Sequence, residues 1–186
     1  EEGSIEREMS LFDATIFDGY EVLESTSKVI GIFKNNELVK QAVEGDLVKI
    51  IVNRTPFYAE SGGQIGDKGL ITSQDLEVFI ENVRKKKNIF IHSGIVKTGV
   101  LKVNAYVQMN VIPSFRQRTT SNHTATHLLQ SALKLSIDSS VSQRGSLVSN
   151  DRLRFDFNAP KPVTIQELQD MEVLINQWIN EDHPIQ

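Results

Sequence analysis

The chain has 186 residues, 39% of them hydrophobic, a formal net charge of -4 and no cysteine. This length and apolar content fit one substantial domain or two small ones with a packed core, and no apolar run is long enough to span a membrane, so we expect a soluble globular protein without membrane partners. The missing cysteines exclude disulfides, cysteine nucleophiles and thiolate metal ligands, and the negative balance gives no overall attraction to a polyanion, so any nucleic-acid contact needs local basic patches.

Residues 1–10 are too acidic for a signal or transit peptide. They resemble the tail of a helix that belongs to an upstream element. Because the chain also lacks an initiator Met, we expect it to be a piece of a longer protein.

Residues 11–112 predict an antiparallel β-barrel-like subdomain. Roughly five to seven short segments rich in β-branched and aromatic residues are separated by turn residues every 8–12 positions or so, a pattern typical of an antiparallel barrel or sandwich. Turns are expected at Asn35–Asn36 and Glu44–Asp46, and Val100–Val111 is expected to form one further strand. The run Arg84–Lys87 predicts a basic hairpin turn, which is either a solvated loop or a nucleic-acid patch.

The block from Thr55 to Gly69 holds four of the eleven glycines. Glycine at this density is incompatible with a regular strand or helix, because it weakens both. The block therefore predicts an ordered or functional loop.

After Pro113 the pattern becomes helical. A polar residue within 119–122 is expected to cap a helix that ends within 137–140. His123 and His127, four residues apart, project from one side of this helix and can present two imidazoles to one metal ion, although the same spacing also occurs in surface helices without metal. The expected core face is apolar and comprises Ala125, Leu128, Leu129, Ala132, Leu133 and Leu135.

The last segments complete a second subdomain, residues 113–186. Strict alternation over residues 152–157 predicts a half-buried strand, and Thr164 with Glu167 predicts a capping box at the start of a final helix. The fold class is therefore α+β, with the β-barrel-like subdomain followed by an α/β subdomain. The expected core face of the final helix comprises Leu168, Met171, Ile175, Trp178 and Ile179.

Three segments resemble, in this order, the motifs of the editing domain of alanyl-tRNA synthetases: Thr55–Gln64, Asn122–Leu129 and Val141–Ser146. The resemblance covers nearly the whole chain. Asp18–Tyr20 is also similar to the segment that joins the tRNA-recognition region to the editing domain in the bacterial and organellar enzymes. The resemblance implies that residues 113–186 have the editing fold shared by threonyl- and alanyl-tRNA synthetases.

The activity that the resemblance implies is hydrolytic proofreading, in which serine or glycine is removed from mischarged tRNA(Ala). The parent enzyme would ligate alanine to tRNA with ATP. A pocket shaped for alanine rejects glycine and serine only weakly, so a second site is needed to clear the errors. The implied partners are the acceptor end of tRNA(Ala) and the rest of the synthetase, in the cytoplasm or, alternatively, in an organelle stroma or matrix.

The resemblance also implies a zinc ion, with His123 and His127 as two of its ligands. In the family a Cys and a further His complete the site, and we expect both to lie beyond the C-terminus of this chain. The editing subdomain would then be truncated, and the isolated chain would have little or no activity. His183 matches no family ligand and is expected to be an exposed loop residue.

Family positions assign roles to the other site residues. Gln143 is expected to act in the editing pocket by bonding substrate or water. Glu60 is expected to be either a general base or a structural acceptor for loop amides. Substrate contacts are expected from the glycine-rich loop and from nearby basic residues, namely Thr55, Gly62, Gly63, Gln64, Arg116, Arg118 and Arg144.

Two other functions stay open. One is a tRNA-binding module without chemistry of its own. The other is an unrelated metal hydrolase that shares only the histidine helix, although the segments around Gly63 and Gln143 argue against it.

Overall fold

The computed structural model describes residues 7–181. The chain divides into two compact units, the first comprising residues 1–61 and 65–116 and the second residues 62–64 and 117–186. None of the helices in the described part of the chain is long and apolar enough to cross a membrane. His183 lies outside the described residues, so its expected exposure stays a prediction.

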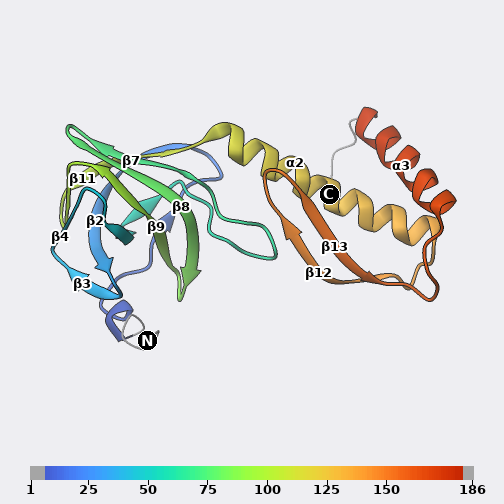
Figure 1. Ribbon diagram of the computed structural model, residues 1–186, viewed down its shortest axis with the longest axis horizontal. Helices are drawn as coiled ribbons and strands as arrows, with labels where there is room; N and C mark the ends of the chain where they lie inside the picture. The colour runs from blue at the N-terminus through green and yellow to red at the C-terminus, as the bar shows by residue number, and fades with distance from the viewer. Residues whose placement is uncertain (1–6, 182–186) are drawn as a thin grey trace. The chain divides into compact units, whose positions relative to one another are not determined.

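The first unit is a closed antiparallel β-barrel (Figure 1). Its six strands follow the order β11-β7-β8-β9-β5-β2, and pairing of β11 with β2 closes the ring, which confirms the predicted barrel. The strands of this unit are β1 (Ile16–Phe17), β2 (Glu24–Lys34), β3 (Glu37–Val39), β4 (Gln41–Val43), β5 (Leu47–Val52), β6 (Arg54–Thr55), β7 (Gly69–Ser73), β8 (Leu76–Lys86), β9 (Ile89–Thr98), β10 (Val100–Lys102) and β11 (Tyr106–Val111).

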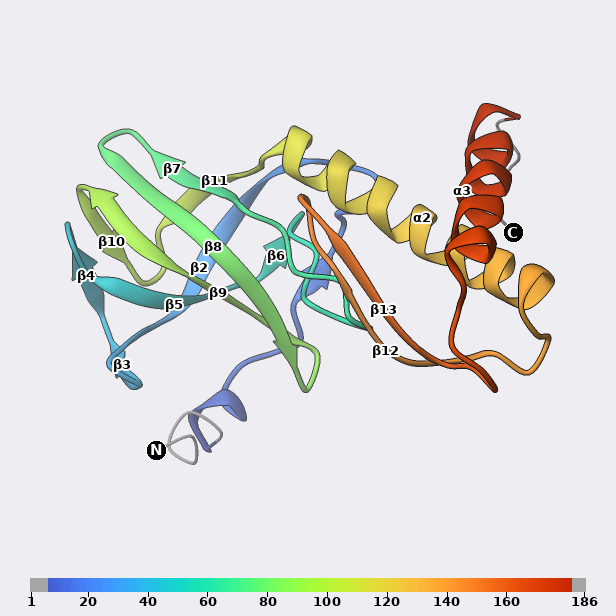
Figure 2. The same cartoon turned by 45° about the vertical axis from the view of Figure 1, so that its right-hand side comes forward.

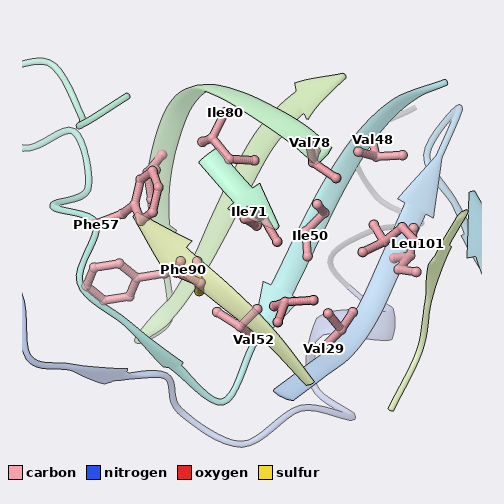
Figure 3. Close-up of a cluster of buried hydrophobic side chains, with 14 of the residues drawn as sticks. Val29, Val48, Ile50, Val52, Phe57, Ile71, Val78, Ile80, Phe90 and Leu101 are labelled. Atoms are coloured by element: carbon pink, nitrogen blue, oxygen red, sulfur yellow. The ribbon is translucent and has the colours of Figure 1, made fainter. Parts of the chain in front are cut away.

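Alternating side chains from these strands fill the barrel. In β9, positions 90, 92, 94 and 96 are buried while 91, 93 and 95 are half-buried, as expected for one face toward a core. Figure 3 shows the aliphatic side chains of neighbouring strands converging in this interior, among them Ile50, Ile71 and Val78. Each fully buried aliphatic side chain contributes about 1.5–3 kcal/mol, so this core carries most of the stability of the unit.

Two tight hairpin turns set the register of long strands. Asn35 and Asn36 join β2 to β3 with φ of 52° and 66°, and Lys87 and Asn88 join β8 to β9 with φ of 47° and 67°. Consecutive left-handed residues form the turn type whose twist matches that of the flanking strands. The predicted turn at Asn35–Asn36 is confirmed. The basic hairpin is confirmed, but its turn lies at Lys87 and Asn88, because residues 84–86 pair with β9 as the end of β8.

The prediction of one strand over residues 100–111 is wrong. The chain forms two strands there, β10 and β11, separated by a bend that includes Asn104 at φ 70°. The reason is that they have different partners, since β10 pairs with β4 and β11 pairs with β2 and β7.

Residues 7–9 form a helical turn whose Met9 side chain is buried. It packs against Phe33, Ile51 and Ile89, on the outside of the main barrel core. In the described part of the chain, the N-terminal segment is therefore held by the barrel.

The second unit contains most of α2 (Pro113–Ser136), a β12–β13 hairpin (Ser142–Val148 and Leu153–Asn158) and α3 (Ile165–Asn180). Figure 2 shows the hairpin alongside α2, with α3 near the end of the same helix. The buried centre is formed by Ala132, Leu133, Val141 and Met171. The predicted alternation in β13 and the Thr164–Glu167 capping box are confirmed.

The predicted start of the histidine helix is wrong, because α2 already begins at Pro113. Proline is well suited to the first helical position, where its missing N–H would have had no helical partner. Ser121, one of the residues that suggested a cap, is bonded within the helix instead. Its Oγ donates to the Gln117 carbonyl four residues back, as Thr126 Oγ1 does to the Asn122 carbonyl one turn later.

The predicted core faces of the two helices are partly wrong. Leu135 in α2 is 72% exposed, and Leu168 and Ile179 in α3 are 53% and 54% exposed. The apolar contact of α3 is centred on Met171 and includes Leu174, Ile175 and Trp178. Leu168 and Ile179 lie outside this contact and stay largely in solvent.

Candidate functional site

The centre of the candidate site is the pair of histidines on α2. The His123 and His127 rings are stacked, with centroids 4.9 Å apart and planes inclined by 19°, and both side chains are exposed. Their spacing of four residues places them one above the other on a single helix face. Two imidazoles are therefore presented together to solvent, as the sequence predicts.

The tip of the glycine-rich loop supplies a partner for the first histidine. Gln64 Oε1 lies 2.6 Å from His123 Nδ1. Since a carbonyl oxygen only accepts, His123 Nδ1 carries the proton and its Nε2 keeps a free lone pair. This fixes the imidazole tautomer that a metal ion bound at Nε2 requires.

Backbone contacts with β12 hold Gln64 in place. The Val148 N–H donates to the Gly63 carbonyl at 2.7 Å, and Gln64 forms a parallel bridge with Val148. Gly63 has φ +83°, and a Cβ there would lie 2.6 Å from the Ser146 carbonyl oxygen. Only glycine therefore allows this close approach, whereas Gly62 at φ +58° faces open space.

The surroundings of His123 favour its neutral form over the charged one. Partial burial and then the charge of the nearby His127 lower the pKa of His123 below its ordinary value. Metal ions bind the neutral imidazole, so a depressed pKa favours ligation at neutral pH.

The two histidines fit a zinc ion as half of its ligand set. Zinc in proteins takes imidazole nitrogen readily and is usually four-coordinate. Within residues 7–181 no group of three or more His, Asp or Glu side chains is placed to hold a metal. A full site therefore needs ligands in addition to those that the described residues offer.

The other predicted residues of the second unit lie at its surface. Gln143 and Arg144 are exposed on β12, at a bulge where the register against β13 shifts between Gln143 and Gly145. Arg118 is exposed near the start of α2, beside a shallow hollow lined by Asn122 and Asn150. These positions leave all three polar side chains accessible.

Thr55, predicted to contact substrate, lies in the barrel core and is fully buried. Its Oγ1 is 2.7 Å from His92 Nε2, and the Phe57 N–H donates to the same Oγ1. The other ring nitrogen, His92 Nδ1, donates to the Ile50 carbonyl at 3.1 Å. Because that carbonyl only accepts, Nδ1 is protonated and the Thr55 hydroxyl donates to Nε2, which completes the network.

Arg116, also predicted to contact substrate, is bound within the first unit. Its guanidinium donates to the Asp67 carboxylate and to the backbone carbonyls of Gly19 and Pro56. Asp67 in turn accepts from the Tyr58 N–H at 2.7 Å. This ion pair, between a half-buried guanidinium and a buried carboxylate, joins both ends of the glycine-rich loop to the first turn of α2.

Glu60 makes polar contacts with side chains of β8. Its Oε2 accepts from Asn82 at 3.3 Å and from Arg84 at 3.4 Å. The contacts differ from the loop amides named in the structural alternative. A general-base role for Glu60 stays a prediction.

The structure thus joins Gln64, His123 and His127 and places Thr55, Glu60 and Arg116 among partners in the barrel unit. Two residues in these networks, His92 and Asp67, were missed by sequence reasoning. The alternation of β9 gives a signal for His92, because it falls on the inward face. No local pattern points to Asp67, whose partner Arg116 is 49 residues away.

Comparisons with known proteins identify relatives of the whole chain. The family model described as tRNA synthetases class II (A) matches residues 2–113. The chain is 88% identical over 186 residues to an alanine–tRNA ligase of Prochlorococcus marinus strain NATL1A, and 47% identical over 185 residues to one of Synechococcus sp. strain RCC307. All of the chain is covered in both cases, and it spans 21% of the length of each relative.

Proposed function

The chain belongs to the class II (A) tRNA synthetase family, and from this premise we propose that it is an editing domain that hydrolyses the ester bond of seryl- or glycyl-tRNA(Ala). The parent protein in this proposal is an alanine–tRNA ligase that charges tRNA with ATP. Two lines support the proposal: the similarity to such ligases over the full chain, and a pair of imidazoles already supported by a loop side chain.

The observation that carries the proposal is the hydrogen bond between Gln64 and His123 beside His127. Surface histidines at this spacing that bind no metal do not require a hydrogen-bond partner that orients the ring. A partner that fixes the tautomer and the ring orientation is what metal-binding histidines typically have. We therefore assign His123 and His127 as zinc ligands and Gln64 as the residue that orients the first of them.

Zinc bound there would act as a Lewis acid that positions or polarises the ester or lowers the pKa of a water molecule. His123 and His127 would supply two imidazoles, and the remaining ligands would have to be residues other than those that the structure describes. Gln143 offers an amide donor and acceptor to substrate or water from the exposed bulge of β12.

Selectivity against alanine follows from hydrogen bonding. A polar pocket that bonds the serine hydroxyl loses that bond with alanine, and buried polar groups left unpaired are costly. Correctly charged alanyl-tRNA is then spared. Gln143 and Arg144 are the polar side chains that we assign to this end of the substrate. Both are exposed in this structure, so the bound substrate would have to bury them for this selectivity to arise.

The test is a deacylation assay with the ligase that contains this sequence. Seryl-tRNA(Ala) and alanyl-tRNA(Ala) are supplied to the parent protein and to His123→Ala and His127→Ala variants. Each variant is expected to lose at least about 100-fold in seryl-tRNA hydrolysis, because removal of a metal ligand removes the ion.

Lys134→Ala is the matched control, since Lys134 is exposed on the same helix two turns beyond His127. It is expected to hydrolyse seryl-tRNA at the parent rate. Unchanged hydrolysis in both histidine variants would contradict the proposal.

The competing function is a tRNA-binding module without chemistry. The observation in its favour is the basic end of the β8–β9 hairpin, where Arg84 and Lys85 at the end of β8 and Lys87 in the turn are exposed. Binding of tRNA(Ala) by the parent ligase with no seryl-tRNA hydrolysis attributable to this segment would support it.

A further inference from the structure

The barrel unit holds a concave site that shares no residue with the histidine pair. It is a cleft of about 470 Å³ at the tip of the β8–β9 hairpin, which is the long green hairpin in Figure 2. This volume is within the range of small-ligand sites in proteins. Four aromatic rings and two lysines dominate its lining, together with a carboxylate, and these residues are Phe17, Tyr20, Tyr58, Phe90, Lys85, Lys87 and Glu60.

The aromatic rings form a fixed platform. Phe17 is stacked on Phe90, with centroids 5.4 Å apart and planes inclined by 17°, and it meets Tyr20 and Tyr58 edge-on at 5.0 and 6.3 Å. Phe90 is only 6% exposed and anchors the group in the barrel core, whereas Tyr20 is 84% exposed. An exposed ring supported by a buried aromatic cluster is ready to stack on a flat ligand at little cost in side-chain entropy.

The charge beside this platform is positive, although the whole chain is acidic. Lys85 and Lys87 are exposed at the hairpin end, and Lys85 Nζ lies 5.7 Å from the centre of the Phe90 ring. Lys87 lies in the left-handed turn and Lys85 near the end of β8, so the closed end of the hairpin carries both lysines. Ammonium groups next to stacking rings suit a ligand that joins an anionic group to a planar one.

The cleft also contains a carboxylate, Glu60. A ligand that consisted of a phosphate alone would have no use for this hydrogen-bond acceptor. Glu60 Oε2 is held by Asn82 and Arg84, which leaves acceptor capacity on the carboxylate. A carboxylate accepts hydrogen bonds from the exocyclic amino group of cytosine or adenine. A planar base with an amino group, attached to a phosphate, meets all three features of the cleft.

We propose that this cleft binds an unpaired nucleotide of single-stranded RNA. The base stacks on Tyr20, its phosphate lies at Lys85 and Lys87, and its amino group donates to Glu60. The inference goes beyond the editing function, because the cleft can bind RNA whether or not the histidine site hydrolyses an ester.

The experiment measures binding of a fluorescein-labelled RNA hexamer ending in CCA to the full 186-residue chain by fluorescence anisotropy. Tyr20→Ala is expected to weaken binding roughly 5- to 150-fold, as found when an aromatic platform for one base is removed, while Tyr20→Phe keeps the parent affinity. The Lys85→Ala/Lys87→Ala double variant is expected to reduce the slope of log K against log salt by about 1.4, at about 0.7 for each lost phosphate contact.

Matched controls lie elsewhere on the same barrel. Tyr106→Ala removes another exposed tyrosine, 68% exposed on β11, and Lys97→Ala/Lys102→Ala removes two exposed lysines. Both are expected to bind the hexamer as the parent does. Equal affinity of Tyr20→Ala and the parent, or an equal loss in Tyr106→Ala, would overturn the proposal.

One more variant separates this proposal from the editing function. His123→Ala leaves the cleft unchanged, so it is expected to bind the hexamer with parent affinity. If Tyr20→Ala binds the hexamer as tightly as the parent does, while seryl-tRNA hydrolysis depends on His123, the nucleotide site alone is overturned. If His123→Ala keeps both seryl-tRNA hydrolysis and hexamer binding, the editing assignment alone is overturned.

Discussion

Gln64 accepts a hydrogen bond from His123 across a separation of 59 residues, at 2.6 Å between Oε1 and Nδ1. The bond selects the tautomer with the proton on Nδ1, so that Nε2 points its lone pair away from the loop. The tautomer and the ring orientation of His123 are therefore set before any metal ion binds.

Gln64→Ala is expected to remove the preference of His123 for the tautomer with the proton on Nδ1. In the metal-free chain at about pH 8, the ¹⁵N shifts of the His123 ring should show a proton on Nδ1, and the variant should show a mixture with the Nε2–H form that dominates in free imidazole side chains. His127, whose ring has no such bond to Gln64, serves as the internal reference. A dominant Nε2–H form of His123 in the parent chain would contradict this prediction.

The stability of the barrel is expected to fall on mild acidification because of His92. Burial lowers the pKa of His92 to about 4, below its ordinary value of 6.5, so the unfolded chain binds a proton that the folded chain resists. The free energy of unfolding is therefore unaffected by His92 above pH 6.5 and falls by roughly 3 kcal/mol as the pH is lowered toward 4. Urea unfolding of the barrel unit at several pH values across this range measures the loss.

The control for this pH effect compares two histidine variants. His92→Gln removes the titrating group, so its unfolding free energy should decline less steeply than that of the parent between pH 6.5 and 4. His127→Gln removes an exposed histidine and should decline in parallel with the parent. Parallel curves for His92→Gln and the parent would rule out His92 as the source.

Arg116→Met is expected to destabilise the barrel unit by about 3–5 kcal/mol, because it leaves the Asp67 carboxylate buried without its cation. Chemical denaturation followed by tyrosine fluorescence or circular dichroism gives the value. Arg118→Met is the control, since Arg118 is exposed two residues later on the same helix, and it should change stability by no more than about 0.5 kcal/mol. A small effect of Arg116→Met would contradict the prediction that the Asp67 carboxylate depends on this cation.

The two adjacent glycines at the loop tip are expected to differ in their tolerance of alanine. Gly62→Ala adds only the cost of a left-handed alanine, about 1 kcal/mol, because nothing lies within 4 Å of the new Cβ. Gly63→Ala pays that cost and also drives the Cβ to 2.6 Å from the Ser146 carbonyl oxygen, so the Gln64 loop tip has to move. Hydrogen exchange of the Val148 amide, which donates to Gly63, should accelerate strongly in Gly63→Ala and little in Gly62→Ala.

Much of the fold could be predicted from local patterns, and the errors have identifiable causes. The alternation of strands, the Asn35–Asn36 turn and the Thr164–Glu167 capping box each depend on neighbours within a few residues. The start of α2 was misplaced because hydroxyl residues look alike as caps and as mid-helix residues bonded to carbonyls four positions back. The break at Asn104 was missed because it follows from distant pairing partners.

The sequence by itself determined the α+β composition, the barrel strands and the pairing of His123 with His127, because helix and strand periodicity place side chains on faces without reference to the rest of the chain. Only the tertiary structure decided that Thr55 lies in the core against His92, that Arg116 is neutralised by Asp67, and that Gln64 supports His123. Each of these contacts joins residues 37 to 59 positions apart, so it depends on how strands and loops close in space.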